Sequence, residues 1–126
     1  MMHAQEMELQ YLLFDTTDEE VGSCSFDALA SVLLPKLPAL VHEVEAVLGW
    51  ACREFGIPAT AGDDAVWDFE VQAVDEHDVP LEIFYDTDRA RVLVPPGLGE
   101  RVTLALTLTG SGTFGAAFRE AFSEAQ

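Results

Sequence analysis

The residues of this sequence that could do chemistry are two cysteines, three histidines and a glycine-rich segment near residue 110. Cys24 comes just before an expected helix, whose dipole would lower the pKa of a thiol, although acidic neighbours oppose this effect. His77 lies within the segment 75–78, whose oxygen and imidazole ligands could attract a divalent ion. One alternative is therefore an enzyme or small-ligand-binding protein that uses Cys24 or His77 at a pocket between helix and sheet.

The segment 110–115 has the spacing G-x-G-x-x-G between an expected strand and an expected helix, as in a dinucleotide-binding site. That chemistry also needs a following strand and an acidic residue about 20 positions on, which binds the ribose. The eleven residues after Gly115 leave room for neither. We therefore interpret the segment as a turn into a helix capped by Thr113. Because ligands as close in sequence as those around His77 rarely all point to one ion, we expect neither a metal site nor a cofactor.

The composition indicates one folded domain with a strong negative charge. The 126 residues are 49% hydrophobic, which is enough for one core and argues against disorder. Twenty-three acidic residues against six basic ones give a net charge of −17, roughly one negative charge per 400 Å² of folded surface. This surface excludes direct binding to nucleic acid or to an anionic membrane. Solubility through self-repulsion, or adaptation to salt, explains the acidity. The alternative is a basic protein partner, for which the chain could be an acidic inhibitor or a mimic of nucleic acid.

The chain is expected to be a cytoplasmic protein. No apolar segment approaches the length needed to cross a membrane, and residues 1–10 do not resemble a secretion signal. Cys24 and Cys52 are then reduced thiols. We find no internal boundary, so residues 1–126 are expected to form a single domain with a frayed tail at 1–5.

Hydrophobic periodicity predicts an α+β domain with the element order β-α-α-β-β-β-β-α. The clearest element is a helix at 37–55, whose apolar residues fall within an arc of roughly 140°. A shorter helix is expected at 26–34, because Ser25 is a suitable cap and prolines follow the segment. Short connections favour a mainly antiparallel five-stranded sheet with the helices on one face. The expected strands are 7–14, 66–74, 81–85, 90–94 and 102–109.

Alternation within the strands predicts the two faces of this sheet. The side chains expected to face the helices are Trp67, Phe69, Val71, Ala73, Val102, Leu104, Leu106 and Leu108. The side chains expected on the other face, as a possible interaction surface, are Leu12, Phe14, Asp68, Glu70, Glu82, Phe84 and Asp86. Like charges on adjacent strands cost stability, so they need solvent or a partner. The alternative is a register slip of one residue, which would bury the aromatic side chains instead.

These patterns favour a small binding domain without evident catalytic residues, which associates through its acidic and aromatic sheet face. The partner is expected to be a basic protein or a second copy of the chain. Salt distinguishes the two, because screening weakens binding to a basic partner and strengthens association between two chains of −17. Trp50 lies outside the apolar arc of its helix and is expected to pack under the helix at 26–34 or to join the interface.

Overall fold

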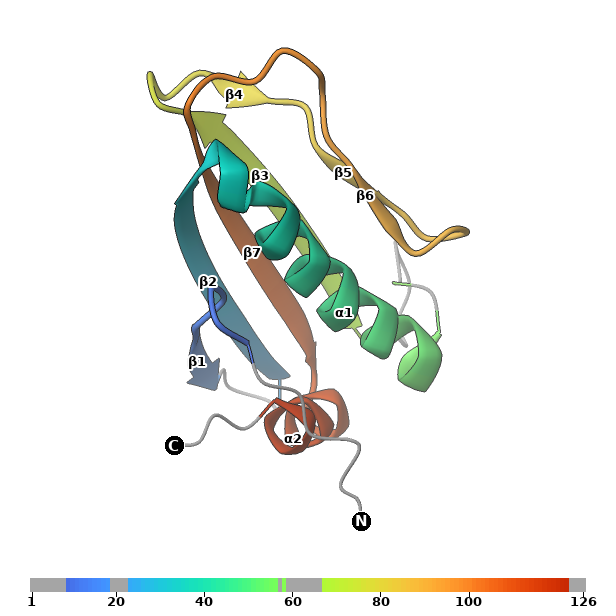
Figure 1. Ribbon diagram of the computed structural model, residues 1–126. Coiled ribbons are helices and arrows are strands. Elements are labelled where there is room, and N and C mark those ends of the chain that lie inside the picture. Colours follow the sequence, from blue (N-terminus) through green and yellow to red (C-terminus); the bar gives the residue numbers. More distant parts are fainter. Residues whose placement is uncertain (1–8, 19–22, 57, 59–66, 123–126) are drawn as a thin grey trace.

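In the described residues, 9–18, 23–56, 58 and 67–122, an antiparallel sheet is covered on one face by helices α1 and α2 (Figure 1). The structure is a computed structural model. Its elements are β1 (Phe14–Asp18), β2 (Ser23–Leu33), η2 (Leu34–Lys36), α1 (Leu37–Phe55), β3 (Trp67–Asp75), β4 (Pro80–Leu81), β5 (Phe84–Asp86), β6 (Arg91–Leu93), β7 (Arg101–Ser111) and α2 (Gly112–Ala121). The five-stranded sheet has the order β1-β2-β7-β3-β4, and β5 pairs with β6 in a second, two-stranded sheet. The predicted α+β class and mainly antiparallel five-stranded sheet are confirmed.

Strand β2 occupies the segment in which the sequence predicts a helix at 26–34, so this prediction is wrong. The strand pairs along its whole length with β7, from Ser23 opposite Ser111 to Leu33 opposite Arg101, and β1 pairs with its other edge. Every second side chain is buried, namely Cys24, Phe26, Ala28, Ala30 and Val32. This period of two is satisfied only by a strand, and pairing with two neighbours outweighs the local capping signal.

Strand β1 lies further along the chain than the predicted strand at 7–14. Residues 15–18, part of an expected loop, pair with β2, and Asp15 lies opposite Asp27. An edge strand tolerates the polar Asp15 and Thr16 because their side chains are exposed to solvent. The other strands follow the prediction more closely, except that the expected strand at 81–85 is divided into β4 and β5. The expected frayed tail at 1–5 lies outside the described residues.

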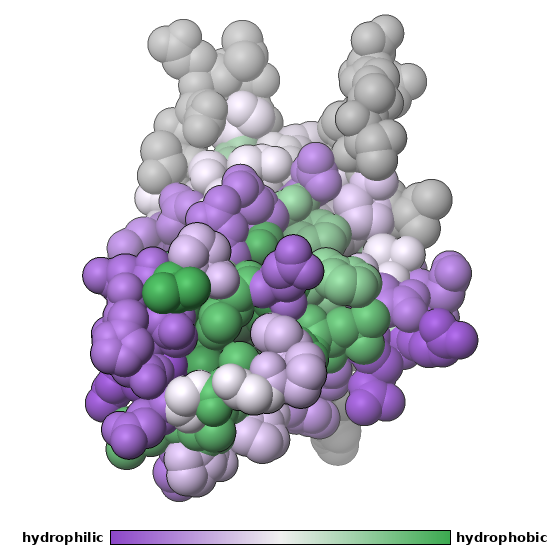
Figure 2. Space-filling view, turned by 90° about the horizontal axis from the view of Figure 1, so that it is seen from above, coloured by the Kyte–Doolittle hydropathy of each residue, from purple (hydrophilic) through white to green (hydrophobic). Residues whose placement is uncertain are grey.

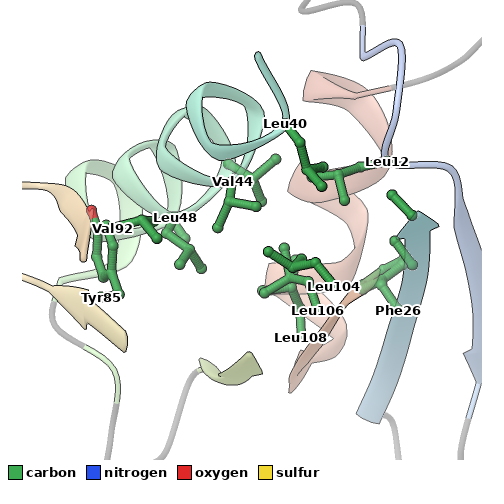
Figure 3. Packing of buried hydrophobic residues seen from close by; sticks show 14 of the residues in the cluster. Leu12, Phe26, Leu40, Val44, Leu48, Tyr85, Val92, Leu104, Leu106 and Leu108 are labelled. Atoms are coloured by element: carbon green, nitrogen blue, oxygen red, sulfur yellow. The ribbon is translucent and has the colours of Figure 1, made fainter. Parts of the chain in front are cut away.

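Helix α1 packs its apolar stripe on the inward face of the sheet. It begins at Leu37, has Pro38 in its first turn and ends before Gly56, whose φ of 87° suits glycine. Residues without exposed surface meet at this contact: Leu40, Val44, Val47, Leu48 and Ala51 of α1, and Leu104, Leu106 and Leu108 of β7. Figure 3 shows Leu40, Val44 and Leu48 on the side of α1 that faces the β7 leucines. Burial of each leucine contributes about 2 kcal/mol. The predicted inward face of β3 and β7 is confirmed, with Trp67 only 1% exposed.

Two further segments close the core on the flanks of α1. Leu12 reaches in beside Leu40 on one flank, while Tyr85 and Val92 pack near Leu48 on the other (Figure 3). Leu12 is 1% exposed, so its predicted place on the open face is wrong. The cause is the path of the chain before β1, which runs beside α1 and presents this side chain to the core.

Helix α2 closes the end of the sheet with an aromatic cluster. It is capped by Ser111, whose hydroxyl accepts a hydrogen bond from the Phe114 N–H at 3.2 Å, and not by the predicted Thr113. Trp50 of α1 packs beside Phe118 and Phe122, with ring centroids 6.0 and 5.3 Å away. Trp50 therefore packs against α2, since the helix expected at 26–34 does not form.

The neighbours Leu12 and Leu13 test this side-chain orientation, because Leu12 is buried and Leu13 is 67% exposed. We predict that Leu12→Ala lowers the free energy of unfolding by about 2–5 kcal/mol, since it leaves a cavity beside Leu40. Leu13→Ala should change it by less than about 0.5 kcal/mol. Urea denaturation of both variants measures the difference. Equal effects would contradict the packing of Leu12.

Candidate functional site

The sheet face opposite α1 is covered by no element in the described part of the chain. Its outward side chains come from every long strand: Ser25, Asp27, Leu29, Ser31 and Leu33 of β2; Arg101, Thr103, Ala105, Thr107 and Thr109 of β7; Asp68, Glu70, Gln72 and Val74 of β3. We call this set, with Leu13 and Asp15 beside β2, the open face. It includes Asp68 and Glu70 of the interaction surface that the sequence predicts.

Carboxylates form a row across the strands of the open face. Asp15 lies opposite Asp27, Asp27 opposite Thr107, and Thr107 opposite Glu70. At a strand spacing of about 4.8 Å, the row is roughly 14 Å long. The Thr107 hydroxyl donates a hydrogen bond of 2.7 Å to Asp27, and Asp68 is the outward residue two positions before Glu70. This row concentrates negative charge at the end of the sheet nearer α2.

Two exposed leucines lie beside the row, since Leu29 is 68% and Leu13 is 67% exposed. Leu33, 52% exposed, lies at the other end of β2. A shallow hollow joins Leu13 and Leu29 to Asp15 and Asp27. The open face can therefore offer a partner both apolar contact and carboxylate acceptors.

Two other residues of the predicted interaction surface, Phe84 and Glu82, are exposed but lie apart from the long strands. Phe84 is 57% exposed and stands opposite Leu93 on the β5–β6 hairpin, outside the five-stranded sheet. Glu82 lies between β4 and β5. Asp68 and Glu70 are the predicted surface residues that belong to the open face.

Phe14 and Asp86 have structural contacts instead of open positions. The half-buried Phe14 packs edge-on against Phe118, with ring centroids 5.1 Å apart. Asp86 closes the hairpin turn, where it accepts hydrogen bonds from the Asp88 and Arg89 N–H groups and from the Arg89 guanidinium at 3.0 Å. The guanidinium is the main cause that lowers the pKa of Asp86. The prediction that Phe14 and Asp86 face outward with the acidic row is wrong, because each is bound into the fold.

Two glutamates of α1 hold the segments on its flanks, a role that the sequence does not indicate. Glu43 accepts hydrogen bonds from the N–H groups of Gln10, Tyr11 and Leu12 at 2.6–3.1 Å. Glu45 accepts from the Val92 N–H at 2.9 Å, and Arg91 lies 3.5 Å from the same oxygen. These carboxylates replace missing strand partners for two edge segments.

The acidic segment around His77 forms the turn between β3 and β4. Asp75 accepts hydrogen bonds from the N–H groups of His77 and Val79 at 2.8 and 3.0 Å, and the bond from Val79 is the main cause that lowers its pKa. Glu76 accepts from the N–H groups of Glu100 and Arg101 at 3.1 and 3.3 Å. The His77 ring is largely exposed, with Nε2 3.8 Å from Glu76. No group of three potential metal ligands occurs among the described residues.

Close packing between β2 and α2 explains why Cys24 is buried and why the segment 110–115 is rich in glycine. Cys24 is 6% exposed, and a Cβ at position 115 would overlap with its sulfur. A Cβ at position 110 would overlap with the Phe114 ring. Gly110 and Gly115 therefore allow the close approach of the turn and helix, in agreement with a structural interpretation of the motif. The buried sulfur of Cys24 is shielded from solvent reagents.

The second cysteine of the chain, Cys52, lies beside Tyr85. The Tyr85 hydroxyl is buried and lies near the Cys52 thiol, but it has no hydrogen-bond partner of normal geometry in the described structure. Burial raises the pKa of both groups. A raised pKa keeps the Cys52 thiol protonated at neutral pH, which disfavours nucleophilic chemistry.

The apolar hollow between α1 and the β4–β5 segment is too small for a ligand. Figure 2 shows apolar side chains at this end of the molecule, surrounded by hydrophilic ones. The cavity is lined by Leu37, Leu81, Ile83, Val94 and Leu98, among others, and has a volume of about 10 Å³. This volume is at the lower limit for one water molecule. Neither Cys24 nor His77 lines it, so it does not supply the pocket expected between helix and sheet.

Comparison of the chain with protein-family models, with curated proteins and with solved structures gave no match. Within the described ranges, no helix combines the length and the apolar character that crossing a membrane requires. The function must therefore be inferred from the residues of the chain itself.

Glu43 and Glu54 provide a matched test of the carboxylate contacts, because both are on α1 and Glu54 is exposed. We predict that Glu43→Gln lowers the free energy of unfolding by about 1–2 kcal/mol, because glutamine lacks the negative charge and has only one acceptor oxygen for the three N–H groups. Glu54→Gln should change it by less than about 0.5 kcal/mol. Chemical denaturation measures both values. A Glu43 variant as stable as the Glu54 variant would contradict the role of Glu43.

The lowered pKa of Glu76 predicts how its contribution to stability depends on pH. Hydrogen bonds from its own backbone N–H and from Arg101 lower its pKa below the ordinary value of 4.5. A lowered folded-state pKa contributes stability above the unfolded value, and this contribution is lost as the pH falls through the folded value. We expect the carboxyl carbon of Glu76 to titrate below pH 4.5 in an NMR titration, and Glu76→Gln to be destabilising at pH 7 but progressively less so below pH 4.5. A titration midpoint at or above 4.5 would contradict these hydrogen bonds.

Proposed function

We propose that the chain is a protein-binding domain whose open face binds a basic protein partner. The observation that carries this proposal is the row of Asp15, Asp27 and Glu70, with Asp68 beside it, on a sheet face that no described element covers. Arg101 is the basic residue among the outward strand positions described above. Such a row is stabilised when cations approach it, because adjacent like charges repel each other.

The alternative partner, a second copy of the chain, is less favoured by the charges. Two copies would bring two acidic rows together, each on a chain of net charge −17. A basic partner relieves the same repulsion and is also steered toward the face at low salt. An acidic inhibitor or a mimic of nucleic acid would be a special case of this proposal, in which the partner's own basic site is blocked.

We place this function in the cytoplasm. The support is the state of the two cysteines, which are both free thiols, one buried and one half-buried. Free thiols are typical of a reducing compartment.

The charge row can be tested with a labelled peptide of evenly mixed lysine and leucine as the probe. We predict that Asp68→Asn combined with Glu70→Gln weakens binding about 2- to 30-fold, because two exposed charge pairs are lost. The control is Glu54→Gln combined with Glu120→Gln, which changes the net charge equally at exposed positions outside the open face. Fluorescence anisotropy at low and high salt measures the affinities.

The control variant should bind like the unmodified chain, and binding should weaken as salt rises. Equal loss in both double variants would mean that net charge alone attracts the probe, which contradicts a specific open face. Sedimentation of the chain alone tests whether the partner is a second copy of the chain. Self-association that strengthens with salt would favour a second copy over a basic partner.

A further inference from the structure

The open face is polarised along its strands. Asp27 and Thr107 lie toward the end nearer α2, together with Glu70, whereas Leu33 lies opposite Arg101 at the other end. Arg101 is exposed and donates a hydrogen bond of 3.1 Å to the Ser31 hydroxyl. The open face therefore changes from carboxylates at one end to a leucine paired with an arginine at the other.

An apolar pair lies in the middle of the face, between the acidic row and the hydrogen bond from the Thr103 hydroxyl to Ser31. Leu29 lies opposite Ala105, whose small side chain leaves room above β7. The hollow described above includes Leu29, Ala105 and Asp27, so apolar and acidic walls meet within it. At about 3.3 Å per residue, the six-residue step from Asp27 to Leu33 covers roughly 20 Å.

We propose that the open face binds a partner segment whose basic and apolar side chains are segregated along its length. The basic part lies over Asp15, Asp27 and Glu70, and the apolar part lies over Leu29 and Leu33. This inference rests on the proposed function and adds to it the order of the partner's residues and the direction of binding. The charges of the open face favour a segregated partner segment. A uniformly basic segment would place some of its cationic side chains against Arg101, whereas a segregated segment keeps its cationic side chains at the acidic end.

Two labelled peptides of the same composition distinguish a segregated partner from an evenly mixed one. Each has about 14 residues, which span roughly 20 Å as a helix. One peptide carries its lysines in one half and its leucines in the other, and the second peptide mixes them evenly. We expect the segregated peptide to bind the full chain about tenfold more tightly, because only it covers the leucines without placing lysines near Arg101.

Variants of exposed leucines locate the apolar contact. Leu29→Thr combined with Leu33→Thr should remove the preference for the segregated peptide, because threonine keeps a strand-forming side chain but loses apolar surface. Leu93→Thr is the control, since Leu93 is 41% exposed on the β5–β6 hairpin. This control should keep the preference. A preference lost equally in both variants would overturn the assigned position.

The remaining outcomes separate this inference from the proposed function. If both peptides bind equally and both are weakened by Asp68→Asn with Glu70→Gln, the basic partner stands and the segregated order is overturned. If neither peptide binds, or if the Asp68 and Glu70 variants have no effect, both proposals are overturned.

Discussion

The packing of α1 against β2, β7 and β3 is the interaction on which the rest of the structure depends, because it decides which face of the sheet stays open. The leucines of β7 and the apolar stripe of α1 leave no exposed surface at their contact. Since side chains alternate along a strand, burying Leu104 and Leu106 directs Ala105 and Thr107 to the opposite face. The same alternation carries Asp27, Glu70 and Leu29 outward on the neighbouring strands. The candidate binding surface is thus a direct consequence of how the core is packed.

The acidic residues of this chain divide into those that the fold uses and those that it leaves available. Glu43 and Glu45 bind backbone N–H groups of the segments on either side of α1. Asp75, Glu76 and Asp86 close turns or bind the start of a strand, and their lowered pKa values follow from those hydrogen bonds. A high count of carboxylates is therefore only partly a surface property. The carboxylates of the open face are different, because among the described residues none of Asp15, Asp27, Asp68 and Glu70 forms an ion pair.

The sequence predicts the parts of this fold in which local pattern and tertiary packing agree. Prolines near Leu37 and a glycine after Phe55 mark both ends of α1, and strict alternation identifies β7. The sequence does not identify β2 as a strand. Its exposed Leu29 and Leu33 are apolar, so apolar and polar residues do not alternate along it. The roles of Glu43 and Glu45 could not be predicted, since their partners lie more than 30 residues away in the chain. The candidate site is predicted in part: the outward positions of Asp68 and Glu70 follow from alternation, whereas Asp15 and Asp27 require the pairing of β1 with β2.

The most direct test of this account is paramagnetic broadening of leucine methyl signals by a spin-labelled peptide with segregated lysine and leucine. We expect strong broadening at Leu13, Leu29 and Leu33, which line one face of the sheet. The methyl signals of Leu40 and Leu48, on the buried side of α1, and of Leu93, on the hairpin, should be broadened much less. Broadening centred on Leu93, with Leu29 and Leu33 unaffected, would contradict the assignment of the open face as the binding surface.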